Sequence, residues 1–576
     1  MQLAWGQPNF EWAARLRPNV WDAVALPIVL GFIALIAYGG QQAVTPFQLG
    51  HEIPISLDPS ALPLYAVRTV LRMGVALAAS LVFSLVYAAL AAKSRQAEKL
   101  LIPVLDILQS IPILGFEAIA VVPFITLFPG QLLGVECAAI FAIFTSQAWN
   151  MTFSLYQSFR TVPGELNEAV RMYQLTPFQS FWRLEVPHAM PGLVWNMMMS
   201  VSGGWFFVVA SEAIKIDGHP VLLPGIGSYI SAAIDQQNLM AIFYAIGTML
   251  IVILMYDQML FRPLLAWSQK FKNELSGEEG MRRPWFLIVL QRARVFDLIG
   301  WLFKSGWTTL GAAIGLVVPR RAPKPIEDKE TPRSVEWGVN IVFGGAAIYA
   351  LWWLVDYIGS NVPISEIFEV ILLGGVTALR VIVLIAIASL IWVPIGVWIG
   401  LRPKIAQIAQ PIIQFLAAFP SNLLFPIVVL GITHFHLNVE IWISPLMILG
   451  TQWYILFNVI GGVIAIPAEL HYAAQNLGVT RWLWWRRIIL PGIFSAYVTG
   501  ALTAAGGAWN ASIVAEVVQW GDTTLTATGV GAYITEHSEG ARAVLGNGVL
   551  CLYVILFNRL LWRRLYNLAA EKLRLD

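Results

Sequence analysis

The amino-acid sequence predicts an all-α membrane protein made of two related bundles of about six spanning helices each. Three observations predict it: an apolar composition, a series of long apolar runs and an internal repeat. Of the 576 residues, 58% are hydrophobic and 12% are charged, whereas soluble proteins carry about 25% charged residues. This composition excludes a soluble enzyme, a disordered regulator and a disulfide-stapled secreted domain. The net charge of +2 gives no sign of nucleic acid as a partner.

Long apolar runs define the predicted spans, because a spanning helix needs about 20 mostly apolar residues. The first half has runs at 22–40, 65–92, 104–128, 132–157, 189–214 and 239–262, and the second half at 337–358, 376–400, 410–432, 438–465, 492–518 and 542–564. Prolines interrupt the third run of each half, at positions 112, 123, 420 and 426. Such breaks are tolerated where the freed backbone faces protein or a water-filled cavity. These two runs therefore either line a pathway or are simple kinks packed against neighbours.

Basic residues in the short loops predict which ends of the spans face the cytoplasm. Lys and Arg are frequent after the second, fourth, eighth and tenth runs and in the C-terminal tail. They are absent from the intervening loops 39–66, 129–136, 359–375 and 433–440. We therefore expect a multi-pass membrane chain with both termini in the cytoplasm. The resemblance described below implies that the membrane is a bacterial inner (plasma) membrane.

The same pattern divides the chain into four parts. These are an N-terminal segment with the first spanning helix (1–64), the core of the first unit (65–265), a cytoplasmic or interfacial linker (266–336) and the second unit (337–576). Within the linker, residues 285–318 are apolar but contain several charged residues. That mixture favours helices lying in the membrane interface, and a hairpin that dips into the bilayer is the alternative.

The two halves repeat one another residue by residue. An offset of 304 positions aligns Glu165 with Glu469, and with it Trp149 with Trp453, Pro187 with Pro491, Trp205 with Trp509 and Glu212 with Glu516. Upstream, an offset of 308 aligns Arg72 with Arg380 and Pro112 with Pro420. One ancestral unit was therefore used twice. Six spans return the chain to its starting side, so we expect a pseudo-twofold axis along the membrane normal, with the substrate route between the halves.

One repeated cytoplasmic loop has the pattern of a short helix–turn–helix. Pro163 and Pro467 precede the first helix of each copy, and a glutamate lies in its first turn, as helix N-termini favour. Gly478 permits a tight turn, and Pro491 is expected to end the second helix before the next span. Such a rigid knob below a membrane bundle can fill a groove on a soluble partner and transmit its motion.

This pattern resembles the EAA coupling loop of type I ABC importer permeases, in which Glu-Ala-Ala is followed by Gly and later by Pro. The second copy matches with Glu469, Ala473, Ala474, Gly478 and Pro491. The first copy matches with Glu165, Ala169 and Pro187 but departs from the family at Val170 and at Gln174, which stands where the family has glycine. The geometry of the first turn is therefore open.

The flanking residues are similar to those of the nitrate/sulfonate/taurine/bicarbonate permease group. The similar segments are Thr-x-Leu-Arg in the second span of each half, Trp453-Tyr-Ile-Leu-Phe-Asn458, and Gly507-Ala-Trp509 with Glu516. The resemblance covers about 65–265 and 375–565. Members of that group are more often homodimers of single units, and the fusion of two units departs from that arrangement.

The resemblance implies the type I ABC importer fold and a permease subunit rather than an enzyme, with a small anion as cargo. It implies two cytoplasmic ABC ATPase subunits that bind ATP and Mg²⁺, a periplasmic or extracellular substrate-binding protein, and surrounding membrane lipid. The chain has no Gly-x-x-x-x-Gly-Lys-Ser/Thr loop, so the nucleotide site must lie on other chains. We expect no cofactor on this chain and no metal, since His434 and His436 have no third ligand nearby.

Ionisable and polar groups inside the spans are the candidate pathway residues, because burying them is costly unless they function or pair. Glu212 and Glu516 either line the outer vestibule or pair with an arginine or with backbone amides, and Arg72 and Arg380 are the expected partners or a source of positive potential. Trp205 and Trp509 are either an aromatic gate or packing residues. Asn510 aligns with Phe206, so any central site is expected to be asymmetric.

Two other functions remain open from the residues. A secondary transporter driven by an ion gradient is the alternative, since many of these are also duplicated bundles. It would transport without an ATPase and would need intramembrane acid relays, which the sequence does not show. An exporter or a membrane enzyme is a third hypothesis, and an enzyme is disfavoured because no catalytic constellation is visible.

Overall fold

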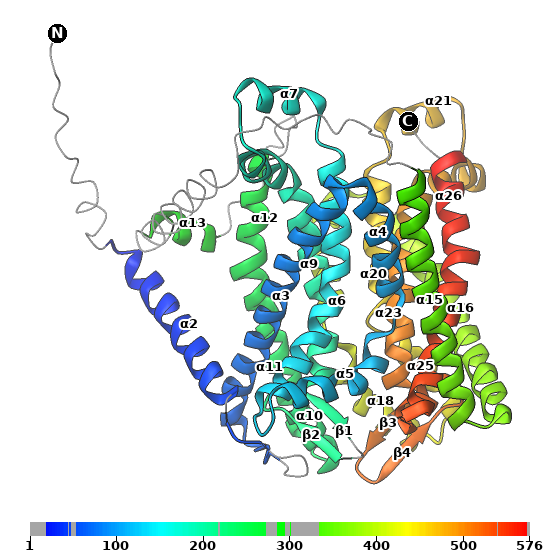
Figure 1. Cartoon of the computed structure of the whole chain (residues 1–576). Coiled ribbons are helices and arrows are strands. Elements are labelled where there is room, and N and C mark those ends of the chain that lie inside the picture. Colours follow the sequence, from blue (N-terminus) through cyan, green and yellow to red (C-terminus); the bar gives the residue numbers. More distant parts are fainter. Residues whose placement is uncertain are drawn as a thin grey trace.

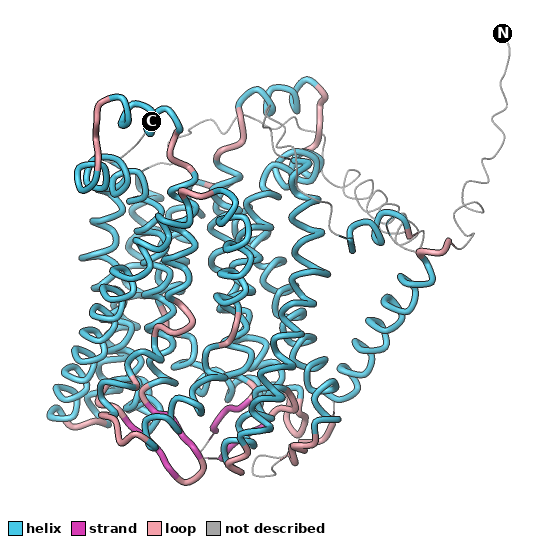
Figure 2. The backbone as a smooth tube through the Cα atoms, turned by 180° about the vertical axis from the view of Figure 1, so that it is seen from behind, coloured by secondary structure: helices cyan, strands magenta, loops and turns pink. Residues whose placement is uncertain are grey.

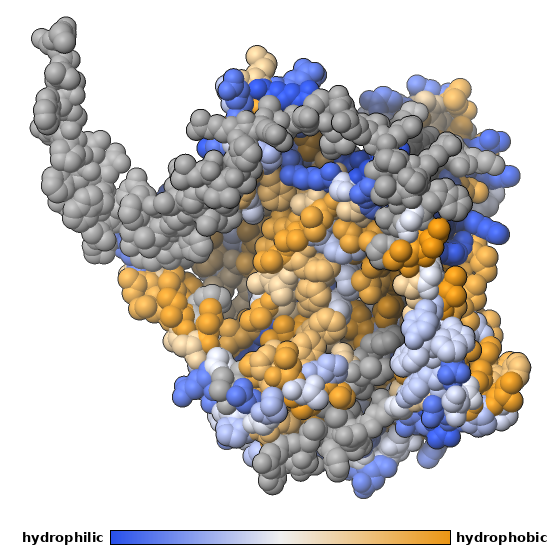
Figure 3. All heavy atoms as spheres, viewed as in Figure 1, coloured by the Kyte–Doolittle hydropathy of each residue, from blue (hydrophilic) through white to orange (hydrophobic). Residues whose placement is uncertain are grey.

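The computed structural model describes residues 19–43, 45–47, 53–216, 219–271, 285–293, 300, 333–537 and 540–572. The described part is a bundle of long, nearly parallel helices with two short β-hairpins at one end (Figures 1 and 2). Its space-filling view shows an apolar band between two hydrophilic ends, as expected for a chain that crosses a bilayer (Figure 3).

The first half begins with α2 and ends with α13. Its elements are α2 (Asp22–Ala43), η1 (Pro59–Ala61), α3 (Leu62–Lys93), α4 (Arg95–Ser110), α5 (Ile113–Leu127), α6 (Leu133–Arg160), α7 (Gly164–Met172), α8 (Pro177–Ser180), η2 (Phe181–Glu185), α9 (Val186–Ser211), β1 (Ala213–Ile216), β2 (His219–Leu222), α10 (Ile226–Asp235), α11 (Leu239–Tyr256), η3 (Asp257–Phe261), α12 (Arg262–Ser268), η4 (Gln269–Phe271) and α13 (Trp285–Arg292).

The second half repeats this order from α15 to α26. Its elements are α15 (Arg333–Asn361), α16 (Ile364–Gly400), α17 (Pro403–Ala418), η5 (Ser421–Leu424), α18 (Phe425–His434), α19 (Val439–Trp442), η6 (Ser444–Met447), α20 (Gln452–Ile464), α21 (Ala468–Asn476), α22 (Arg481–Trp484), η7 (Trp485–Ile489), α23 (Leu490–Ala515), β3 (Val517–Trp520), β4 (Thr523–Thr526), α24 (Val530–Glu536), α25 (Gly540–Phe557), η8 (Asn558–Trp562) and α26 (Arg563–Lys572). In each half, the antiparallel hairpin (β1–β2 or β3–β4) follows the long helix α9 or α23.

Fewer helices than the twelve expected meet the requirements of a span. Among the described residues, seven helices are long and apolar enough to cross a membrane, and up to nine if each of two bent pairs is one span. Helices occupy the other expected positions, and α6 illustrates why they fall short: it contains Glu136, Gln147, Asn150 and several hydroxyl residues. Arg72 of α3 binds Glu136, and Gln147 donates to Met73 of α3, whereas Asn150 is exposed.

The third span of each half is broken at Pro112 and Pro420, as predicted, whereas Pro123 lies inside α5 and Pro426 in the first turn of α18. Helix α4 ends at Ser110 and α5 begins after Pro112, while α17 and the η5–α18 segment meet at Pro420 with a bend of 76°. A further break, which the sequence did not indicate, bends the α19–η6 segment against α20 by 46°. Its counterpart in the first half, α6, is a single helix.

Some expected boundaries were wrong. Helix α16 begins at Ile364, so most of the segment 359–375, expected as a loop, is helical. Within the linker, α13 packs Phe286 and Val289 against Ala25 of α2. The remainder of the 285–318 segment lies outside the described residues, apart from residue 300, so its choice between interface and bilayer stays a prediction.

The two halves lie side by side and contact one another through their broken helices. Helices α4 and α5 contact α23 and α25 of the other half, and α17 contacts α9 and α11. The short helices α7 and α21 project from the same end of the bundle, opposite the β-hairpins (Figure 1). The structure therefore places the two repeated loops on one face, which the expected coupling role requires.

Candidate functional site: coupling helices and outer ion-pair clusters

The short helices α7 and α21, for which a coupling role is expected, end in the same way although their sequences differ. Gln174 has φ of 51° and Gly478 has φ of +64°, so both residues are in the left-handed region. In the first copy the N–H of Gln174 donates to the carbonyl of Arg171 (3.1 Å), and that of Leu175 to Val170 (3.1 Å). This pair of bonds is the Schellman arrangement that caps helix C-termini.

The second copy reproduces both bonds. The N–H of Gly478 donates to the carbonyl of Gln475 (3.1 Å), and that of Val479 to Ala474 (2.9 Å). The helix cap left open by the sequence is therefore the same in both copies. The residues after it differ, because Arg481 has φ of 53° where the first copy has Pro177. Gln174 adopts its left-handed conformation at a cost of about 1–2 kcal/mol relative to glycine.

The coupling knobs present their residues to solvent. Glu165 and Glu469 are exposed, whereas Ala474 and its equivalent Val170 are buried on the inner side of the short helices. Large apolar side chains lie on the outer side: Met172, Tyr173, Leu477 and Trp482 are 70–84% exposed. Exposed apolar groups of this size at a membrane protein's hydrophilic end mark a contact surface.

The second short helix of each loop, α8 or α22, continues into a long helix without interruption, so the expectation that Pro491 ends the second helix was wrong. The π-helical turn η7 precedes α23, and the N–H of Leu490 donates to the carbonyl of Trp485 five residues back. Proline cannot donate and crowds the preceding turn, and the wider π turn accommodates it. The same turn, η2, precedes Pro187 and α9.

The continuous helices reach from the knobs to the opposite end of the bundle. Residues 177–211 and 481–515 each form one run of 35 residues, which spans roughly 50 Å at 1.5 Å per residue. Glu212 and Glu516 follow directly at the far ends. One continuous helix therefore joins each glutamate to the short helices at the other end of the bundle.

Glu212 is the centre of a buried ion-pair cluster in the first half. Its Oε1 accepts from Thr69 Oγ1 and from Arg72 Nη1, both at 2.7 Å, and its Oε2 accepts from the N–H of Gly227 at 2.7 Å. Arg72 also binds both carboxylate oxygens of Glu136, at 2.6 and 2.7 Å. This cluster ties α9 to α3, α6 and the start of α10.

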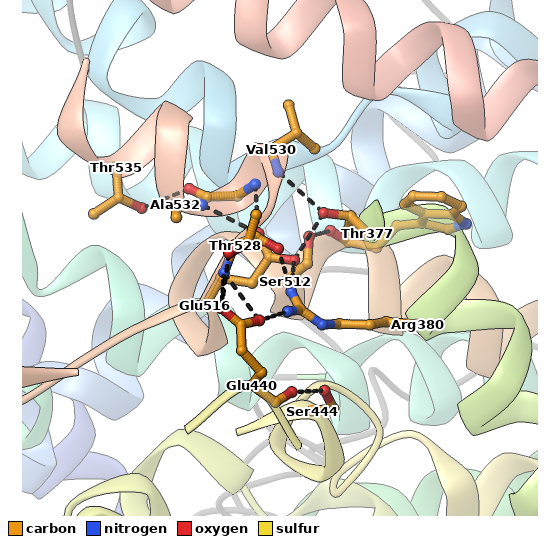
Figure 4. Close-up of polar contacts among 12 residues, drawn as sticks. Thr377, Arg380, Glu440, Ser444, Ser512, Glu516, Thr528, Val530, Ala532 and Thr535 are labelled. Atoms are coloured by element: carbon orange, nitrogen blue, oxygen red, sulfur yellow. Dashed lines mark hydrogen bonds and ion pairs between the residues drawn. The ribbon is translucent and has the colours of Figure 1, made fainter. Parts of the chain in front are cut away.

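Glu516 has the equivalent partners in the second half (Figure 4). Thr377 donates to it at 2.7 Å, Arg380 at 3.2 Å, and the N–H groups of Gly531 and Ala532 at 2.7 and 3.1 Å. Arg380 also donates to Glu440 and to the carbonyl of Thr528 (2.7 Å). The cluster ties α23 to α16, α19 and the start of α24.

Two glycines let the short outer helices approach these carboxylates. A Cβ at Gly225 would lie 2.3 Å from the Glu212 carboxylate, and one at Gly529 would lie 2.2 Å from that of Glu516. The following N–H groups can then point at the negative charge, which is favourable at a helix N-terminus. Burial raises the pKa of Glu212 and Glu516, which lie just beyond the spanning helices, and the hydroxyl, arginine and backbone donors oppose the rise.

The cluster is more open in the second half. The side chain of Arg380 is 12% exposed against 4% for Arg72, and that of Glu440 is 45% exposed against 13% for Glu136.

Sequence reasoning missed Glu136 and Glu440 as partners, although the offset of 304 that aligns Glu212 with Glu516 also aligns these two. The structure thus brings the expected glutamates and arginines together as pairs, and a pathway role for them stays a prediction.

The other candidate pathway residues lie in two settings. Trp205 and Trp509 are 2% exposed and pack edge-on against Tyr256 and Phe557 of their own halves. An aromatic gate has no support in these packed positions. Asn510, by contrast, lies between the halves, and its Oδ1 accepts from the N–H of Ile113 at the start of α5 (2.7 Å).

Among the residues that the structure describes, the cysteines and histidines do not gather into a site. Cys137 and Cys551 are free and half-buried. No group of three His, Cys, Asp or Glu residues suited to a metal ion occurs within the described ranges.

Comparison with known proteins follows the same repeat. The family model described as binding-protein-dependent transport system inner membrane component matches twice, over residues 80–257 and 392–565. The chain is 29% identical over 136 residues to the bicarbonate transport system permease protein CmpB of Synechococcus elongatus, covering 24% of this chain and 48% of CmpB. It is 25% identical over 246 residues to the nitrate import permease protein NrtB of Synechocystis, covering 41% and 84%.

A third relative is the taurine transport system permease protein TauC of Escherichia coli, 28% identical over 143 residues, with 24% of this chain and 49% of TauC covered. The chain thus spans about half the length of the bicarbonate and taurine relatives it matches. Both family matches contain a coupling helix and a long helix that leads to a buried glutamate. The chain therefore belongs to the family of binding-protein-dependent transport system inner membrane components and contains two type I ABC importer permease units fused in one polypeptide.

Proposed function

We propose that the chain is the permease subunit of an ATP-binding-cassette importer, and that α7 and α21 couple it to two cytoplasmic ATPase subunits. The single observation that carries the proposal is the pair of identically capped knobs on one face, each continuous with a helix that crosses the bundle. ATP and Mg²⁺ bind on the partner subunits, and this chain forms the translocation pathway. The chain lies in the inner membrane, with both termini and both knobs in the cytoplasm.

The coupling follows from rigid connections. An ATPase that closes on nucleotide pulls on the exposed side chains of Tyr173 and Leu477, and α9 and α23 carry that displacement to Glu212 and Glu516. Each glutamate is bonded to α3 or α16 and to a short outer helix. The outer segments of a half therefore move with its knob as one body.

A small anion is the proposed cargo. The names of the relatives, which are bicarbonate, nitrate and taurine permeases, support this class. A separate substrate-binding protein delivers the cargo to the face that carries the β-hairpins. Uptake of nitrate, bicarbonate and taurine into vesicles, each with ATP inside and binding protein outside, tests the class, and transport of a cation or a neutral solute instead would refute it.

Co-purification with the partner ATPase tests the coupling role. Tyr173→Asp and Leu477→Asp place a charge on the two knobs, and Phe435→Asp is the matched control, since Phe435 is 69% exposed at the other end of the bundle. We expect the ATPase to be lost from the first two variants and retained by the control. Retention by both knob variants would refute the docking site, and uptake without any ATPase would favour the secondary-transporter alternative.

A further inference from the structure

Helix α5 belongs to the first half by sequence, but its two ends are held by different halves. Near its C-terminal end, Val121 is fully buried against Val135 and Ala138 of α6 in the same half. A Cβ at Gly134 of α6 would lie 2.9 Å from the α5 backbone, so this contact is close. Its first turn is bonded instead to α23 and α25 of the second half.

Two asparagines make that second attachment. Asn510 Oδ1 of α23 accepts from the N–H of Ile113 at 2.7 Å, and Asn547 Nδ2 of α25 donates to the carbonyl of Gly115 at 2.8 Å. Asn547 is fully buried. A Cβ at Gly115 would lie 1.7 Å from the Oδ1 of Asn547, so only glycine at position 115 leaves room for the Asn547 amide.

The equivalent interface on the other side of the molecule lacks these bonds. Asn510 aligns with Phe206, and Asn547 aligns with Ile246 when the π-helical turns η3 and η8 are superposed (Asp257 with Asn558). Gly115 aligns with the bulkier Leu423. There, Asn422 Nδ2 only approaches the carbonyl of Phe206 at 3.4 Å.

We propose that Asn510 and Asn547 latch the two halves together at the first turn of α5, and so stabilise the conformation in which the outer ends of the halves touch. That outer contact is present: the N–H of Gly521, at the tip of the β3–β4 hairpin, donates to the carbonyl of Ile234 of α10 at 3.0 Å. The N–H of Ile113 is one of the donors that the start of a helix leaves without an intrahelical partner, and Asn510 of the other half accepts from it. Asn547 adds a second bond across the same interface, to the carbonyl of Gly115. Separation of the halves must first release this latch.

The latch makes the transport cycle asymmetric. It concerns the relative motion of the halves, and so rests on the proposed transport function, but the asparagines themselves are positioning residues. They hold α5 and do not need to touch cargo. On the α5 side, hydrogen bonds of 2.7 and 2.8 Å join the halves. On the α17 side the bond from Asn422 is 3.4 Å long, and the rings of Trp195 and Phe457 stack at 5.8 Å. The polar attachment between the halves is therefore stronger on the α5 side, and the apolar packing lies on the other.

Distance measurements between the outer ends test the latch without any ATPase. Spin labels at Gln236 and Thr524, both exposed, report on the contact in nanodiscs, in a chain with Cys137 and Cys551 replaced by alanine. We expect Asn510→Leu and Asn547→Leu each to raise severalfold the ratio of long to short distances between the two labels. The double variant should raise this ratio on the order of tenfold, as the loss of two hydrogen bonds predicts. Asn422→Leu is the matched control, expected to leave the ratio unchanged.

A conservative variant and a local readout separate the latch from misfolding. Asn510→Asp keeps an acceptor for the Ile113 N–H and is expected to retain the parental distances. Hydrogen exchange at Ile113 is expected to accelerate in Asn510→Leu and not in Asn422→Leu. A parental distance distribution in the double leucine variant, unchanged exchange at Ile113, or an equal shift in the Asn422 control would overturn the proposal, whether or not an ATPase binds the chain.

Discussion

Replacing Glu212 by glutamine removes one charge from the outer cluster while conserving its shape. All three partners of this carboxylate are donors: the Thr69 hydroxyl, the Arg72 guanidinium and the Gly227 N–H, each at 2.7 Å. Glutamine offers one acceptor oxygen and one NH₂ group, so at least one donor loses its acceptor and meets another donor instead. Rotating the glutamine amide by 180° does not relieve this contact, because an N–H donor faces each of its two positions: Arg72 on one side and Gly227 on the other.

The expected loss of stability follows from burial. Breaking a buried pair costs about 3–5 kcal/mol when the remaining charge is left alone. Arg72 keeps its bidentate bonds to Glu136, so we expect roughly 2–3 kcal/mol, close to the cost of an unsatisfied buried donor. Glu516→Gln should cost less, since Arg380 and Glu440 are more exposed than Arg72 and Glu136.

Thermal unfolding in detergent, followed by tryptophan fluorescence, measures this order. Glu469→Gln is the control, because it makes the same chemical change at an exposed position. The expected order of melting temperatures is control, then Glu516→Gln, then Glu212→Gln as the lowest. An unchanged melting temperature in Glu212→Gln, or a larger loss in Glu516→Gln, would show that the cluster is not the structural tie inferred here.

Three further predictions follow from single contacts. Gly478→Gln should weaken ATPase binding by roughly fivefold, since a glutamine in the left-handed conformation costs about 1 kcal/mol. Gln174→Gly should strengthen ATPase binding or leave it unchanged. Titration of purified ATPase against both variants measures the affinity, and weaker binding by Gln174→Gly would contradict the reasoning. Gly529→Ala should lower the melting temperature more than Gly506→Ala, since its Cβ would lie 2.2 Å from Glu516 while that of Gly506 meets nothing within 4 Å. Arg160→Met should change the free energy of unfolding by less than about 1 kcal/mol, because the contact between Arg160 and Glu98 is 3.6 Å long and 52% of the Arg160 side chain is exposed. A larger loss, measured by chemical denaturation, would show that this surface ion pair also stabilises the adjacent short helix α7.

Several features of the site were accessible from residues alone. The offset of 304 placed Glu212 with Glu516 and the two coupling loops in register, because duplication copies residue spacing. Applied further, it would also have exposed Glu136 and Glu440. The broken third spans were predicted from Pro112 and Pro420, since proline removes a backbone donor wherever it stands in a helix.

Other features needed the fold. Whether Gln174 could replace glycine depended on two capping bonds, and propensity alone disfavours it. The bend before α20 and the continuity of α23 through Pro491 depended on which backbone groups find partners nearby, and single-residue preferences do not report that. The same holds for Asn547, a polar residue in an apolar run that the sequence did not mark.

Composition and repetition decided that this chain is a duplicated membrane bundle, because the length and polarity of a span are set by the bilayer and are local to each segment. Tertiary structure decided which charges neutralise one another, on which face the two knobs lie and which half holds α5. These depend on groups far apart in the chain: Thr69 and Glu212 are 143 residues apart and Gly115 and Asn547 are 432 apart. Contacts across such separations are made by packing, and local pattern carries no record of them.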